Sequence, residues 1–293
     1  MSSPLRRARF ALLLALLCAV LPVPARAQSA TELRWNPAWP RFRPSEYVLS
    51  GVAGAADLVL YFGVRDAHQP RRNGGFLLDD PIRDAVRLRS PGGRDAARFT
   101  SDMTALAGMT WTVGVDSFLV PVLRGKSDVA AQLLLMDGEA FAVSNLIATS
   151  LFKVVARARP SYADCQRSLK FDPLCESSPM GSFPSGHTNN AFTAAGLSCA
   201  HHLHLPIYGD RTADVLACAG NIVLAATTGS LRVLGDRHYA TDVWVGAMIG
   251  FGVGYAFPTL LHYGKVHAES GNASALQPLA PSVPLGPSIS GTF

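Results

Sequence analysis

The sequence has few charged residues and almost no strand signals. Only 16% of its 293 residues are Asp, Glu, Lys or Arg, below the roughly 25% of an ordinary soluble domain. Because 48% of the residues are hydrophobic, the chain can bury a sizeable core, which excludes a largely disordered protein. The 26 Gly, 20 Pro and 5 Cys show no period, which excludes collagen-like and disulfide-scaffold proteins. The sequence lacks a basic tract with interleaved aromatics, so we expect no nucleic-acid partner.

The first thirty residues have the pattern of an export signal. Three arginines precede a short apolar run over residues 10–21, and two prolines break that run. An Ala-Arg-Ala sequence ending at residue 27 is a small-x-small cleavage site, so we predict a signal peptide over residues 1–27. An uncleaved anchor helix is the alternative, although the run is shorter than a membrane span. Without the four arginines of this segment, the formal charge of +5 falls to +1.

Six long apolar stretches with helical periodicity follow. They cover residues 46–64, 105–123, 129–156, 187–204, 212–229 and 241–263. Residues 65–98, between the first two stretches, contain Gly-Gly pairs and Pro and are predicted to be irregular. We therefore predict an all-α helical bundle that forms a single domain over residues 28–264. Residues 265–293 are rich in Pro, Ser and Gly and form a loose tail.

Membrane association is left open by these stretches. Residues 243–261 are free of charge and about long enough to cross a bilayer. Asp57, Asp116, Asp137 and Glu139 interrupt the earlier stretches, and acidic groups are costly at mid-bilayer. A periplasmic bundle that rests on a membrane fits as well as a bundle that spans one.

Four cysteines remain after the predicted cleavage. An even number in an exported protein indicates disulfides. Cys165 with Cys175 would close a short polar loop, and Cys199 with Cys218 would join two helices. Four buried free thiols are the alternative, since unpaired cysteine is often buried.

The first motif ends the stretch over residues 129–156. Because the residue before a proline is pushed out of the α region, a helix should end just before Pro160 and leave the Arg159 guanidinium free to reach a cavity. Guanidinium groups suit phosphate oxygens. Lys153 lies six residues earlier. Taken alone, these basic residues would only complement the dipole of a helix end.

The second motif is Pro184-Ser185-Gly186-His187, directly before an apolar stretch. Ser185 can cap the helix, and Gly186 lets a ligand approach the free N–H groups of the first turn. His187 then lies where a proton donor would face a bound anion. A lone histidine at a helix start is more often a surface or cap residue, but the whole string is far less common by chance.

The third motif places Arg232 before His238 and Asp242. If His238 begins a helix, Asp242 lies four residues on and on the same face, so its carboxylate can hold one ring nitrogen. The other ring nitrogen would then be a nucleophile. A surface His–Asp pair on a helix is the structural alternative.

Together, the three motifs resemble the signatures of the type-2 phosphatidic-acid phosphatase and vanadium haloperoxidase superfamily, in the same order, over about residues 130–260. The resemblance implies an all-α bundle with the phosphate site between helices, and phosphatase activity that needs no metal and no cofactor. Residue by residue, it implies that His238 is the nucleophile, Asp242 orients it and His187 is the acid and base. Arg159, Arg232, Ser185 and the Gly186 N–H would hold the phosphate oxygens, in keeping with the need to stabilise spread negative charge.

The sequence departs from the family pattern at two positions. The family has Lys seven residues before its first-motif Arg, where this chain has Phe152, with Lys153 displaced by about 100° around an ideal helix. We keep Lys153 as a candidate phosphate ligand. The family's Ser before the third-motif Arg is replaced by Leu231.

Other polar residues have simpler interpretations. Asp79 and Asp80 are predicted to lie in a solvated loop, or in a lid over the site. Asp137 and Glu139 could pair with the arginines of the first motif. The histidines at 201, 202 and 204 suggest a polar turn rather than a metal site, so we predict no metal ligands.

The leading functional hypothesis is an exported, metal-independent phosphatase in the periplasm or in a membrane with a periplasm-facing site. Its substrate would be a phospholipid or another phosphorylated small molecule, and a membrane surface is the expected partner. A vanadate-dependent haloperoxidase, in which His238 would ligate vanadate, is one alternative. A membrane-associated binding protein that keeps the fold without turnover is the other.

Overall fold

The computed structural model describes residues 32–264 except 68, 168–174 and 176–180. The predicted signal peptide and the predicted tail therefore lie outside the described residues. The described residues from Leu33 onward form one compact unit. Across the described residues the regular structure is helical, and the only β pairing is an isolated bridge between Arg72 and Arg157. The predicted all-α bundle is confirmed.

The elements in chain order are α2 (Pro44–Leu58), η1 (Val59–Gly63), α3 (Asp79–Val86), α4 (Pro91–Met109), η2 (Thr110–Leu119), α5 (Val120–Leu123), α6 (Ser127–Val155), α7 (Tyr162–Arg167), α8 (Gly186–His204), α9 (Arg211–Leu234), α10 (Ala240–Pro258) and η4 (Thr259–Tyr263). The prediction that residues 65–98 are irregular was wrong for α3 and for the start of α4. Ser90 caps α4 by accepting a hydrogen bond from the Gly93 N–H, and Pro91 occupies the first turn. The Gly pair there lies in a capped first turn rather than in a loop.

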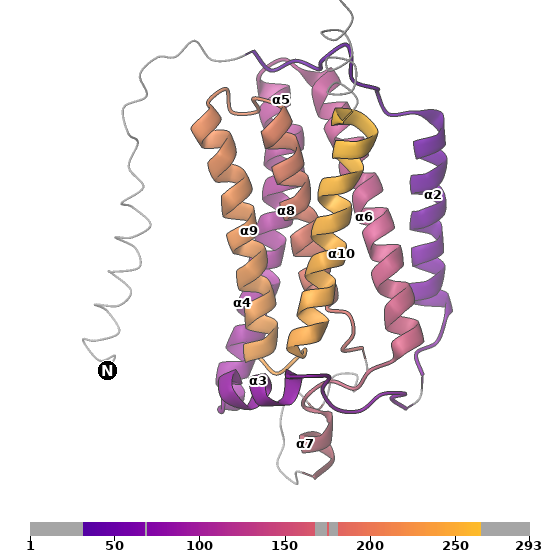
Figure 1. The fold of residues 1–293 in the computed structure, drawn as a ribbon, viewed down its shortest axis with the longest axis vertical. Coiled ribbons are helices and arrows are strands. Elements are labelled where there is room, and N and C mark those ends of the chain that lie inside the picture. The colour runs from indigo at the N-terminus through magenta and orange to yellow at the C-terminus, as the bar shows by residue number, and fades with distance from the viewer. Residues whose placement is uncertain (1–31, 68, 168–174, 176–180, 265–293) are drawn as a thin grey trace, which may run out of the picture. The chain divides into compact units, whose positions relative to one another are not determined.

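Helix α8 runs through the middle of the bundle, between α4, α6, α9 and α10 (Figure 1). Most of its side chains are small or polar, and most are buried. Its closest neighbour is α10, where Gly246, Gly250 and Gly254 recur every four residues. A Cβ atom at these glycines would lie 2.7 Å from Ser185 O, 2.1 Å from Asn189 O and 2.3 Å from Thr193 O. The glycines therefore let the two backbones approach closely, as small residues do between membrane helices.

The outer faces of the bundle are apolar. Four long helical segments are apolar enough to cross a membrane: Pro91–Leu123, Ser127–Val155, Arg211–Leu234 and Ala240–Tyr263. Large hydrophobic side chains remain exposed on them, including Trp244 at 69% and Met248 at 63%. Such a surface fits lipid rather than water as its surroundings. We conclude that the bundle is membrane-associated.

Buried polar pairs lie near the C-terminal end of α8. His201 contacts Asp137 at 3.0 Å, and His202 contacts Asp116 at 3.0 Å and Asp214 at 2.7 Å. The predicted polar turn is therefore wrong for His201 and His202, which are buried inside α8. Buried polar groups of this kind need partners, and the acidic residues of the neighbouring helices supply them.

Two disulfides link the cysteines of the described chain. Cys165 bonds to Cys175, and Cys199 on α8 bonds to Cys218 on α9. The first closes the connection between the segment that carries Arg159 and the turn that carries Ser185 and Gly186.

We predict that the Cys165–Cys175 bond forms in the protein purified without reductant and stabilises it. For a closed loop of about ten residues, the chain-entropy model gives about 3 kcal/mol of unfolding free energy. Mass spectrometry of the mature protein, digested without reductant, should show the linked peptide, and Cys165→Ser with Cys175→Ser should lower the unfolding temperature. Complete alkylation of both thiols in the native protein would contradict the prediction.

Candidate functional site

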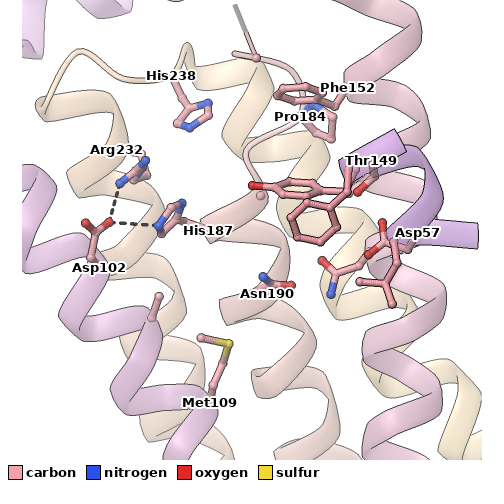
Figure 2. Close-up of a pocket in the computed structure, with 18 of the residues that line it drawn as sticks. Asp57, Asp102, Met109, Thr149, Phe152, Pro184, His187, Asn190, Arg232 and His238 are labelled. Atoms are coloured by element: carbon pink, nitrogen blue, oxygen red, sulfur yellow. Dashed lines mark hydrogen bonds and ion pairs between the residues drawn. The ribbon is translucent and has the colours of Figure 1, made fainter. Parts of the chain in front are cut away.

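The three motifs meet at one end of the bundle because α6 and α9 run antiparallel to α8 and α10. The C-terminal ends of α6 and α9 lie beside the N-terminal ends of α8 and α10 (Figure 1). A cavity of about 570 Å³ opens there, and Arg159, His187, Arg232 and His238 line it. Figure 2 shows the rings of His238 and His187 in the same part of this cavity, with Arg232 beside them.

His238 is buried in the turn between α9 and α10. Its Nδ1 lies 2.6 Å from the carbonyl oxygen of Ser182. Since a carbonyl can only accept, Nδ1 carries the proton and Nε2 is left with a lone pair. Burial and the positive charges of Arg232 and Arg159 hold the pKa of His238 well below its usual value. The ring is therefore neutral at neutral pH, which is the state a nucleophile requires.

Asp242 does not make the contact that the third motif predicts. Its carboxylate accepts from Arg157 at 2.6 Å, from the Ser182 hydroxyl at 2.5 Å and from the Tyr239 N–H at 2.8 Å. Helix α10 begins at Ala240, so His238 precedes it and the four-residue face rule does not apply. Asp242 thus reaches His238 through Ser182, whose hydroxyl it binds and whose carbonyl holds the ring.

His187 begins α8 and shares a partner with Arg232. The Asp102 carboxylate lies 3.1 Å from His187 Nε2 and 2.8 Å from the Arg232 guanidinium, as the dashed lines in Figure 2 show. The side chain of His187 is 45% exposed. Its partial desolvation in the cavity, together with the charges of Arg232 and other arginines, lowers its pKa to about 4, while Asp102 opposes this shift. A bound phosphate would raise this pKa and so favour the protonated acid.

Asp102 is a site residue that the sequence analysis missed. It lies on α4, and Ala105 and Met109 on the same face of that helix also line the cavity. The i, i+3, i+7 spacing of these three residues was the available signal. It was missed because the predicted apolar stretch began only at residue 105, three residues after Asp102.

The two predicted phosphate arginines both face the cavity. Arg232 occupies the last turn of α9, and Arg159 follows α6. Among the described residues, the buried Nε atom of each has no hydrogen-bond partner. Burial and the nearby cations Arg237 and Arg232 lower the pKa of Arg159 to about 9. An anion bound here would relieve that repulsion and supply partners to both guanidinium groups.

Ser185 and Gly186 have different surroundings. The Ser185 hydroxyl is fully buried, contacts the Thr188 hydroxyl at 2.8 Å and accepts from the Thr188 N–H, so it caps α8. The cap uses an acceptor site of the hydroxyl, so the role of Ser185 as a phosphate ligand stays a prediction. Gly186 lines the cavity, and a Cβ there would meet nothing within 4 Å. Its N–H at the helix N-terminus is thus accessible to an anion.

Lys153 points away from the cavity. Its Nζ lies 2.7 Å from the Val64 carbonyl and 2.7 Å from the Asp66 carboxylate, while Phe152 lines the cavity instead. The reason is that α6 ends at Val155, four residues before Arg159, with Ala156 in a left-handed conformation. Lys153 and Arg159 are therefore not on one helix, and the predicted phosphate contact of Lys153 is not made.

We predict that Lys153→Met retains activity. The ammonium group fixes the end of η1 rather than the substrate, so kcat/KM should change by less than about threefold, and the lost ion pair should cost at most about 1 kcal/mol of stability. Steady-state kinetics of phosphate release, with Arg159→Met as the comparison, checks this. A hundredfold loss of kcat/KM in Lys153→Met would show instead that Lys153 contacts the substrate.

Arg157 anchors the loops beneath the site. It is fully buried and contacts Asp79 at 2.7 Å and Asp242 at 2.6 Å, with its guanidinium 4.0 Å from the Tyr239 ring centre. Asp79 also accepts from the N–H and the hydroxyl of Thr241. The predicted solvated loop is therefore wrong at Asp79, because α3 buries this carboxylate against the start of α10.

Comparison with known proteins agrees with the motifs. Residues 134–265 match the model of the PAP2 superfamily. A lipid A 1-phosphatase of Porphyromonas gingivalis is 40% identical over 179 residues, which are 61% of this chain and 34% of that protein. Lipid A 1-phosphatases of Rhizobium johnstonii and Rhizobium etli are each 31% identical over 122 residues, or 42% of this chain and 44% and 47% of theirs. The chain thus spans less than half the length of these curated relatives.

A solved structure is also similar. It is a transmembrane PAP2-type phosphatidylglycerolphosphate phosphatase from Bacillus subtilis, with 20% identity and a TM-score of 0.44 over 80% of this chain and 98% of that one. A likeness of this size does not support residue-by-residue comparison. The family model and the curated relatives support placing the region over residues 134–265 in the PAP2 superfamily, on its phosphatase branch.

Proposed function

We propose that the chain is an exported phosphatase that removes a phosphate from a lipid through a phosphohistidine intermediate. One observation carries the proposal: the buried Arg232, the partly buried Arg159 and two histidines converge on one cavity beside the open N-terminus of α8. Fixed cations and N–H groups stabilise the charge that spreads over a transferring phosphoryl group.

The proposal assigns a role to each residue of the site. Nε2 of His238 attacks phosphorus, and the bond from phosphorus to the substrate oxygen breaks as His187 donates a proton to that oxygen. Neutral His187 then removes a proton from water, whose oxygen attacks the phosphohistidine. The P–N bond breaks, and phosphate leaves with His238 neutral again. Arg159, Arg232 and the Gly186 N–H hold the phosphate oxygens in both steps, and no metal is required.

The mouth of the cavity favours a lipid substrate. Tyr61 and Phe62 line the cavity while remaining 62% and 78% exposed. A lipid can therefore keep its acyl chains against this apolar rim while its phosphate reaches the cations. Because the curated relatives are named as lipid A 1-phosphatases, lipid A carrying a 1-phosphate is the first substrate to test.

The test is phosphate release by the purified full chain in detergent, with EDTA present. The panel contains lipid A 1-phosphate, phosphatidic acid, phosphatidylglycerol phosphate, undecaprenyl pyrophosphate and p-nitrophenyl phosphate. We expect turnover of at least one lipid, with a higher kcat/KM than for p-nitrophenyl phosphate. Vanadate binding without any turnover would instead indicate a binding protein, and turnover that requires an added divalent ion would exclude the proposed mechanism.

A further inference from the structure

A second cluster of ionisable side chains lies outside the cavity. Glu46 on α2, Glu139 on α6 and His262 on η4 each place one potential ligand atom within 4.8 Å of the other two. Their exposed fractions are 4%, 1% and 0%. None of them lines the cavity or contacts the catalytic histidines. The cluster therefore needs an explanation separate from phosphate chemistry.

The tautomer of His262 makes this cluster electron-rich. Nδ1 lies 2.9 Å from the Pro40 carbonyl, so Nδ1 carries the proton and Nε2 has a lone pair. Nε2 has no hydrogen-bond partner among the described residues and lies 3.6 Å from a Glu46 carboxylate oxygen. A buried lone pair this close to a carboxylate oxygen is unfavourable unless a cation or a proton lies between them. A histidine that ligates a metal usually donates its other N–H to a carbonyl in this way.

The charges of the cluster do not balance. Glu46 is paired with Arg43, whose guanidinium lies 2.7 Å from one carboxylate oxygen. Oε1 of the buried Glu139 has no hydrogen-bond partner within the described part of the chain. If both carboxyl groups are ionised, two negative charges face one arginine, and a buried charge without a partner is costly.

We propose that Glu46, Glu139 and His262 bind a divalent transition-metal ion, with Zn²⁺ the best match. Two carboxylate oxygens and one imidazole nitrogen form a ligand set that Zn²⁺ accepts, and water would complete the tetrahedron. Ligands about 2.1 Å from a tetrahedral ion lie about 3.4 Å from one another, close to the 3.6 Å between His262 Nε2 and Glu46. The ion would give both orphaned atoms a partner.

Such an ion would stabilise the fold and take no part in the reaction. It would join the start of α2, the middle of α6 and the segment after α10, which are distant in the sequence. Because the site is buried and separate from the cavity, removing the ion should lower the unfolding temperature and leave kcat at 25 °C unchanged. The inference does not depend on the proposed function.

The experiment uses the full chain purified in detergent, stripped with a chelator and then equilibrated with Zn²⁺. After gel filtration we expect about one Zn²⁺ per chain by elemental analysis, and an unfolding temperature raised by roughly 5 °C. Co²⁺ in place of Zn²⁺ should give the visible absorption of nitrogen and oxygen coordination. Glu139→Gln and His262→Gln should each lose the bound metal and the thermal shift.

Two matched variants serve as controls. Asp128→Asn removes an exposed carboxylate from the same helix as Glu139. His204→Gln removes a histidine outside the cluster, at the C-terminal end of α8. Both variants should keep one Zn²⁺ per chain. Wild-type protein that retains no Zn²⁺ or Co²⁺ would overturn the proposal and indicate a proton shared within the cluster. Metal content that is equal in wild type, Glu139→Gln and His262→Gln would also overturn it, and if one variant fails to fold, the other decides.

Discussion

We expect His238→Ala to abolish turnover and covalent phosphate labelling together. Nε2 of this ring is the lone-pair nitrogen beside Arg159 and Arg232, since Nδ1 is engaged by the Ser182 carbonyl. Removing a nucleophile leaves only the background catalysis of the surrounding groups, so kcat should fall by more than about 10⁴-fold. Rapid quenching at alkaline pH with ³²P-labelled substrate measures the phosphoenzyme directly.

His187→Ala is the matched control for the nucleophile. This variant keeps the nucleophile but lacks the acid, so it should still accept label from p-nitrophenyl phosphate, whose leaving group needs little protonation. Its turnover of lipid substrates, whose leaving groups need a proton, should be strongly reduced. Undiminished labelling in His238→Ala would rule out His238 as the nucleophile.

The second large effect is expected at two arginines that are two residues apart: replacing Arg157 should lower stability, whereas replacing Arg159 should lower activity. Arg157 is fully buried between Asp79 and Asp242, whereas Arg159 faces the cavity with no anion at its Nε. Breaking a buried ion pair from one side leaves charges uncompensated and costs about 3–5 kcal/mol. Arg157→Met should therefore lower the unfolding temperature sharply, or prevent the protein from accumulating.

Arg159→Met should have the opposite profile. It removes a cation that burial and other arginines already disfavour, so stability should be unchanged or higher. The loss of a phosphate ligand should reduce kcat/KM by about 10²–10³-fold. Thermal unfolding and kinetics measured on both variants decide the assignment. Equal loss of stability in the two variants would show that Arg159 is also structural.

The helical class and the site's location could be predicted from the sequence because both depend on local patterns. Apolar periodicity predicts the long helices. Pro184-Ser185-Gly186-His187 predicts a capped helix start independently of the rest of the fold. Even so, the sequence-based prediction failed where the same residues fit two different local structures. The Gly pair after Pro91 resembles a loop, yet it occupies the capped first turn of α4, so the sequence did not show that one helix runs from Pro91 through Asp102.

Only the tertiary structure decided which polar side chains face the substrate. The sequence by itself determined the order of the three motifs and the residues they contain, since these are properties of short segments. The partners of Asp242, Lys153 and Arg157 depended on where α6 ends and α10 begins and on the segments packed beside them. A buried charge takes whichever opposite charge or dipole the fold brings within hydrogen-bond distance. Arg157 therefore joins Asp79 to Asp242, residues 163 positions apart, which no spacing rule could have shown.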